Sequence, residues 1–120
     1  MAGTVVATEL RLGYTKKITF EWTSSAGGAA DGVSAFSYEG KLIGLTTIPD
    51  AVAAPTTLYD VRVNDADGHD VLLGAGANRS ATATENVAEA SLGAVAGSVL
   101  TLAVTAAGDA KEGTVILWVR

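Results

Sequence analysis

Hydrophobic and polar residues alternate over much of the chain, which predicts strands and little helix. The clearest alternation runs from Lys17 to Thr23, where an isoleucine and two aromatic residues share one face and polar residues share the other. This pattern is typical of an antiparallel strand with one buried face. The segment before it, Thr4 to Leu12, predicts a second strand that turns at Gly13.

Further strands are expected where valine, threonine and other strand-favouring residues gather between turn residues. They are Val33–Tyr38, Lys41–Ile48, Leu58–Asn64, His69–Leu73, Ser98–Ala106 and Thr114–Arg120. Ser24–Gly32 and Gly74–Thr84 are rich in small residues, and we expect both to be flexible loops. Glu85–Ala96 is the one helix candidate, because its apolar residues follow a helical spacing.

These elements define an all-β fold. About seven or eight short strands with at most one short helix indicate an antiparallel β-sandwich or a flattened barrel. No internal repeat or break in composition divides the chain. Residues 1–120 are therefore expected to form a single β domain, with residues 1–8 as a candidate extended arm.

Composition and charge narrow the function classes. The chain is 48% hydrophobic, but much of that share is alanine, so the core should be small and should gain stability from neighbouring subunits. A net charge of −5 disfavours binding to nucleic acid or to an anionic membrane. The absence of cysteine excludes disulfides and thiolate metal sites. The first residues lack the pattern of a secretion signal, so we expect the protein to be made and kept in a cytosol.

The acid-rich segment Asp65–Asp70 has oxygen ligands near a glycine, as calcium loops do. An EF-hand loop needs glycine at its sixth position and glutamate at its twelfth. With Gly68 in the sixth position, the first falls on Val63 and the twelfth on Gly74, and neither supplies a carboxylate. A hairpin turn accounts for these residues, so we predict no metal site here.

No other segment predicts catalysis or a cofactor. His69 is the only histidine, and the chain has no Gly-x-Ser-x-Gly motif to present a nucleophile. Gly74–Arg79 begins like a dinucleotide fingerprint, but Arg79 stands where the third glycine belongs. We therefore predict a protein that is not an enzyme, with no catalytic residue and no cofactor. Trp22 and Trp118 lie in apolar runs and are expected in the core.

Two parts of the chain resemble small virion proteins of tailed bacteriophages. The first comprises Tyr59–Leu72 and Gly74–Ala81, and the second comprises Gly97–Leu102 and Gly113–Leu117. The resemblance implies a capsid decoration protein, made in the host cytoplasm, that binds the outer shell of the virion as a homo-oligomer, commonly a trimer. Its partners would be further copies of itself and the major capsid protein. The alternatives are a tail-tube, tail-fibre or head–tail connector protein, or a carbohydrate-binding β-sandwich module.

Four residues are the candidates for such an interface. Asp65 and Asp67 belong to an aspartate-rich segment that would complement a basic patch on a partner. Asn78 and Arg79 lie in the second expected loop, and we predict that Arg79 pairs with a carboxylate across the interface.

Overall fold

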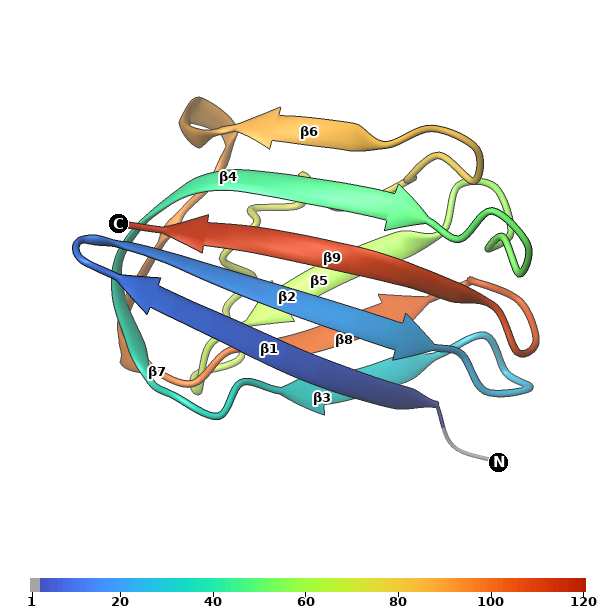
Figure 1. The fold of residues 1–120 in the computed structure, drawn as a ribbon, viewed down its shortest axis with the longest axis horizontal. Coiled ribbons are helices and arrows are strands. Elements are labelled where there is room, and N and C mark those ends of the chain that lie inside the picture. Colours follow the sequence, from blue (N-terminus) through green and yellow to red (C-terminus); the bar gives the residue numbers. More distant parts are fainter. Residues whose placement is uncertain (1–2) are drawn as a thin grey trace.

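The computed structural model describes residues 3–120, which form nine strands in two facing antiparallel sheets (Figure 1). The strands are β1 (Thr4–Leu12), β2 (Thr15–Thr23), β3 (Ala30–Val33), β4 (Tyr38–Pro49), β5 (Asp60–Asn64), β6 (Glu85–Ala88), β7 (Ala94–Ser98), β8 (Thr101–Thr105) and β9 (Glu112–Val119). A single turn of 3-10 helix, η1 (Glu89–Ser91), separates β6 from β7. The predicted all-β sandwich or flattened barrel is confirmed.

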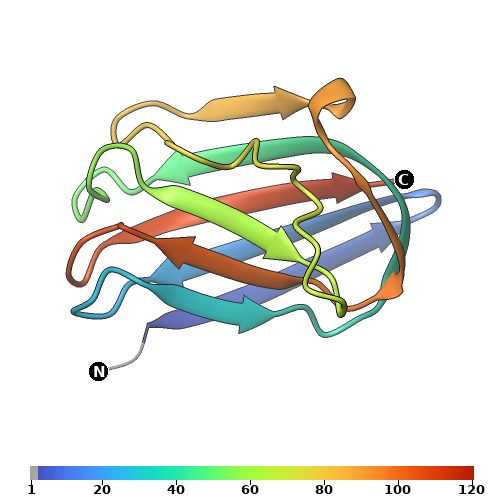
Figure 2. The ribbon, with the colours of Figure 1, turned by 180° about the vertical axis from the view of Figure 1, so that it is seen from behind.

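The larger sheet has the strand order β1-β2-β9-β4-β6, and β7 pairs with the first part of β4. The smaller sheet has the order β3-β8-β5 and lies across one face of the larger sheet (Figure 2). The last strand, β9, lies between β2 and β4, so the C-terminal segment is a central strand of the larger sheet.

Alternating side chains from both sheets fill the space between them. Along β9, every second residue from Gly113 to Val119 points inward and is buried. Trp22 from β2 packs against Tyr59, with ring centroids 5.6 Å apart. Burial of these alternate apolar residues is the main favourable term in folding, as the sequence pattern predicts.

The expected helix over Glu85–Ala96 is wrong. The structure forms β6 and β7 there, joined by η1, which no side chain caps. Both strands pair with β4, β6 with its middle part and β7 with its first part. Ser91 and Gly93 within the segment weaken a helix, and the long β4 supplies hydrogen-bond partners that an isolated helical turn would lack.

Two of the expected strands are also interrupted. His69–Leu73 is not a strand, because the Asp70 carboxylate accepts the backbone N–H groups of Leu72 and Gly74 and starts a series of turns. Val33–Tyr38 is divided, because Ser34 leaves the small sheet and exchanges hydrogen bonds with Leu100.

The structure also revises the expected arm and the first expected loop. Thr4–Thr8 of the candidate arm belong to β1 and pair with Thr19–Thr23, whereas residues 1–2 lie outside the described residues. The last part of Ser24–Gly32 forms the start of β3. Gly74–Thr84 follows an irregular path without a strand, as predicted.

Candidate interaction surfaces

The predicted interface residues Asp65 and Asp67 lie in a tight turn after β5. Its backbone closes where Gly68 donates to the Asp65 carbonyl and Asp65 donates to the His69 carbonyl, both at 3.0 Å. The Asp65 carboxylate accepts the N–H groups of Asp67 and His69, also at 3.0 Å. Asp65 therefore fixes the turn, while Asp67 and His69 are exposed at its tip.

Asn78 and Arg79 lie in the segment that covers the free edge of β5. Asn78 is exposed and adopts a φ of 55°, a left-handed conformation that asparagine tolerates better than most residues. Arg79 and Tyr59 form an antiparallel bridge, in which the Arg79 N–H donates to the Tyr59 carbonyl at 2.7 Å. The segment thus completes the edge of the smaller sheet.

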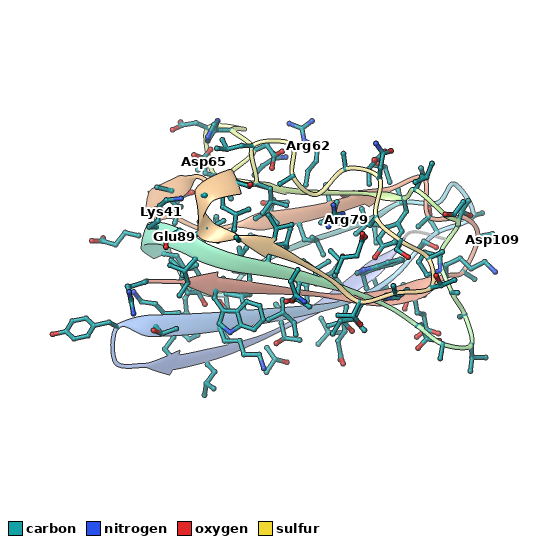
Figure 3. The ribbon with its side chains drawn as sticks, turned by 90° about the horizontal axis from the view of Figure 1, so that it is seen from above. Lys41, Arg62, Asp65, Arg79, Glu89 and Asp109 are labelled. Atoms are coloured by element: carbon teal, nitrogen blue, oxygen red, sulfur yellow. The ribbon has the colours of Figure 1, made fainter. Side chains whose placement is uncertain are left out.

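The Arg79 side chain turns inward between the sheets' edges and toward β6 (Figure 3). It is 14% exposed, and its Nη1 lies 3.8 Å from Glu85 Oε1. Its nearest carboxylate therefore belongs to its own chain. Pairing with a carboxylate of a partner stays a prediction, and it would require Arg79 to exchange or share the Glu85 contact.

The structure brings these four predicted residues into two separate places. Asp65 lies at one end of the molecule, and Arg79 lies midway along it (Figure 3). Among residues 3–120, no three histidine, aspartate or glutamate side chains are placed to hold a metal ion. In the same part of the chain, no helix is long and apolar enough to cross a membrane.

A different surface stands out on the larger sheet, on the side turned away from the smaller sheet. We call it the outer face. The strand registers arrange its residues in three central rows across β1, β2, β9 and β4. The rows are Leu10-Lys17-Trp118-Gly44, Thr8-Thr19-Ile116-Thr46 and Val6-Glu21-Thr114-Ile48.

The outer face is more apolar than a solvated sheet face normally is. Val6 and Leu10 are 61% and 53% exposed, and Ile116 and Trp118 are only partly buried. Trp118 was expected in the core, and that expectation is wrong. Its neighbour Leu117 points into the core, so the Trp118 side chain points to the outer face. Its indole lies over Gly44, where a Cβ atom would come within 3.1 Å of the ring.

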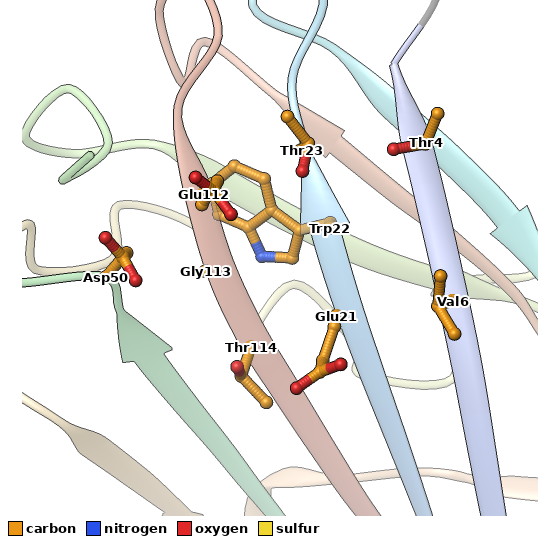
Figure 4. Close-up of a pocket in the computed structure, with 9 residues that line it drawn as sticks. All are labelled: Thr4, Val6, Glu21, Trp22, Thr23, Asp50, Glu112, Gly113 and Thr114. Carbon is orange, nitrogen blue, oxygen red and sulfur yellow. The ribbon is translucent and has the colours of Figure 1, made fainter. Parts of the chain in front are cut away.

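The two ends of the outer face carry opposite charge. Glu21, Asp50 and Glu112 surround a shallow depression at the end where β2 finishes and β9 begins (Figure 4). Hydrogen bonds from the N–H groups of Ala53 and Val52 hold the pKa of Asp50 below its ordinary value, so this carboxyl stays ionised.

The opposite end of the outer face is basic. Lys17 lies beside Leu10 and Trp118, and Lys16 and Arg120 lie together next to the β1–β2 turn. Lys41 lies at this end of β4, but its ammonium group is occupied by the carbonyls of Glu89, Leu92 and Gly93. Lys16, Lys17 and Arg120 therefore supply the positive charge at this end of the larger sheet.

The core itself contains polar groups that differ in how well they are satisfied. The Tyr38 hydroxyl donates to Glu9 Oε1 at 2.5 Å, and burial, with this hydrogen bond, raises the pKa of the phenol. Trp22 Nε1, Thr47 Oγ1 and the Tyr59 hydroxyl are buried without a partner among the described residues. Burial likewise raises the pKa of Tyr59.

Comparison with family models, with curated proteins and with solved structures found no match to this chain. The surfaces described above are therefore the basis for any functional proposal beyond the sequence resemblance.

Sequence reasoning missed the outer face. A signal for it was present, because Val115–Val119 is a continuous run of apolar residues in a strand. Such a run is typical of a strand buried on both faces, whereas the rest of the larger sheet alternates. The registers of β1 and β2, which bring Val6 and Leu10 beside it, are not visible in the sequence.

Proposed function

We propose that this protein is a non-enzymatic structural component of a tailed-bacteriophage virion, where it decorates the outer shell of the capsid. The proposal rests on the resemblance that the sequence suggested for Tyr59–Leu72 and Gly74–Ala81, and on where the structure places these residues. In the structure these stretches form one surface unit, comprising β5 and the segment that returns along its free edge.

One half of the second similar part lies next to this unit, and the other half lies in the larger sheet. Gly97–Leu102 includes the start of β8, which pairs with β5, and Gly113–Leu117 forms most of β9. The resemblance therefore covers an exposed turn, the strand β8 that pairs with β5, and a strand of the facing sheet. A loop held on a rigid sheet is suited to binding a partner surface without chemistry.

In this proposal the protein binds the shell as a homo-oligomer, with three copies as the arrangement that the resemblance implies, and bridges subunits of the major capsid protein. The exposed Asp67 and Asn78 supply contacts to the shell. Asp65 and Arg79 hold the shape of the segments that present them. A carboxylate in this position complements a basic patch on the partner.

The proposal is tested by adding the purified chain to capsid shells that lack it and measuring co-sedimentation. We expect saturable binding at a fixed ratio to the major capsid protein. Asp67→Lys should weaken that binding at least tenfold, whereas Asp109→Lys, an equal charge change on a loop at the opposite end of the molecule, should not (Figure 3).

Immunogold labelling of intact particles separates the phage alternatives. Label on the capsid supports decoration. Label on the tail or at the neck would instead assign a tail-tube, tail-fibre or connector role, and particles without label would contradict a virion role altogether.

One observation favours a carbohydrate-binding module as a second candidate. Trp118 is partly exposed beside Leu10, Thr15 and Lys17, which line a shallow depression. An exposed indole is a suitable platform for the apolar face of a sugar. Glycan-array binding that Trp118→Ala abolishes would support this function, and a blank array would contradict it.

A further inference from the structure

The strongest unexplained feature of the molecule is the uncovered outer face of the larger sheet. Its central strand, β9, has apolar residues on both sides, and the smaller sheet covers only one of them. Val115, Leu117 and Val119 are fully buried, while Ile116 and Trp118 face outward. A strand with this composition is normally covered on both sides.

The chain covers a small part of the outer face itself, because the Trp118 indole lies on Gly44 and shields that part of the backbone. This contact does not account for Val6 and Leu10 on β1, which are more than half exposed. Nor does it account for Ile116, which lies in the middle row between Thr19 and Thr46. Exposed apolar residues thus lie on β1 and β9, on either side of the polar outward residues of β2.

The three central rows of the outer face are self-complementary. Consider a two-fold axis that lies in the plane of the face and runs across the strands along the Thr8-Thr19-Ile116 row. This axis relates the first copy to a second copy whose strands run in the reverse direction. It places Leu10 of one copy over Val6 of the other, and Ile116 over Ile116. It also places Lys17 over Glu21.

Charge selects this orientation. Lys17 and Glu21 are four residues apart on β2, about 13 Å along the strand, so they cannot pair within one chain. In the reversed arrangement each copy supplies both partners, and two Lys17–Glu21 pairs form. The alternative axis, parallel to the strands, would place the basic end of one copy against the basic end of the other, and the acidic end against the acidic end.

We propose that the outer face of the larger sheet is an isologous interface with a second copy of this chain. The molecule measures 36 × 26 × 24 Å. Face-to-face packing over its two longer dimensions has room for the roughly 800 Å² per partner of a standard interface. Packed sheets of this kind align their strands within about 30°, which keeps the rows in contact.

The pairing is independent of the proposed capsid function. It requires only two copies, and it uses a different surface from the Asp67 turn. A three-fold ring on the shell would need contacts elsewhere, and pairing would add to them.

The oligomeric state of the purified chain is the first test. Sedimentation equilibrium should give twice the monomer mass of 12.1 kDa, or an even multiple of it. A chain that stays monomeric at roughly 100 µM, where even weak specific interfaces are populated, would overturn the proposal. A species of three copies without any even-numbered species would overturn it too, while leaving the capsid function intact.

Charge reversal gives a sharper test. Lys17→Glu alone and Glu21→Lys alone should each raise the dissociation constant at least tenfold, because each creates two like-charged contacts. An equimolar mixture of the two variants should form mixed dimers, and the double variant Lys17→Glu/Glu21→Lys should regain wild-type affinity. Failure of both the mixture and the double variant to recover would rule out the predicted register.

Matched controls come from the smaller sheet. Arg62→Glu and Asp31→Lys make the same charge changes on exposed positions of β5 and β3, and neither should alter the dimer. If the outer-face variants lose binding to capsid shells while the wild-type chain is a monomer, the face serves the shell and the proposed pairing is wrong.

Discussion

The outward-facing sides of the two sheets differ in how many apolar residues they carry, although their inward-facing sides are alike. On the smaller sheet, the register places Asp31, Ala103 and Arg62 in one row, with Thr105 on one side of it and Thr101 on the other. Val33, beside Thr101, is the one large apolar residue that these rows expose. On the larger sheet, the equivalent surface carries Val6, Leu10, Ile116, Trp118 and Ile48 among its polar residues. Both sheets bury their inner side chains in the same core. The difference shows that core formation alone does not explain the composition of β9.

The largest expected effect separates the two sides of β9 itself. Leu117→Ala removes a fully buried side chain from the core and should lower the free energy of unfolding by about 2–5 kcal/mol. Ile116→Ala, one residue earlier on the outer face, should cost less than about 1 kcal/mol in the monomer. Urea denaturation at low protein concentration measures both. Equal losses would show that the outer face is already packed within one chain.

A second contrast concerns the two buried tyrosines, one from each sheet region. Tyr38→Phe removes the donor to Glu9 and should lower the free energy of unfolding by about 1–2 kcal/mol. Tyr59→Phe removes a buried hydroxyl that has no partner among the described residues, so it should be neutral or stabilising by up to about 1 kcal/mol. Thermal unfolding distinguishes them, and a larger loss for Tyr59→Phe would reveal a partner of the hydroxyl, either the neighbouring Thr47 or a buried water molecule.

A third contrast compares two arginines near the smaller sheet. Arg79→Ala should cost roughly 0.5–1 kcal/mol of stability, because its side chain is 14% exposed and lies 3.8 Å from Glu85. Arg62→Ala should have no measurable effect, since its side chain is 59% exposed and 4.0 Å from Asp70. If Arg79→Ala leaves stability unchanged but reduces binding to capsid shells, the predicted role of Arg79 in an interface is supported.

The smallest expected effect is spectroscopic and compares the two tryptophans. Trp22 is 1% exposed, whereas Trp118 is partly exposed on the outer face. Acrylamide should therefore quench the fluorescence of Trp118 in the monomer and leave that of Trp22 largely unquenched. Trp118→Phe should remove the fraction that is quenched. Raising the protein concentration should protect Trp118 if two copies pair. Quenching that does not change with concentration would place Trp118 outside the interface.

Local patterns were enough to predict the fold class. Strand-favouring residues between turn residues located β1 to the residue and most of β4 and β9, and alternation of apolar and polar residues located most of β2. The turn at Asp65–Gly68 was also predictable, since aspartate and glycine have strong local preferences there. The error at Glu85–Ala96 arose because its residues have weak preferences, and pairing with β4 decided their conformation.

The candidate site was less predictable. Asp65, Asp67, Asn78 and Arg79 were chosen from residue type and loop position, but the structure uses Asp65 to close a turn and places Arg79 against Glu85. Nothing in the sequence indicated these internal contacts, because they depend on which segments return to the edge of β5.

The sequence by itself determined that this chain forms short antiparallel strands around a modest core, since most of its apolar residues gather in strand-favouring segments between turn residues. Only the tertiary structure decided which strands became neighbours. Hydrogen bonds between distant segments brought Leu10, Lys17 and Trp118 into one row and Val6 and Glu21 into another. An apolar face with opposite charges at its two ends is a property of that pairing, because no single strand contains it.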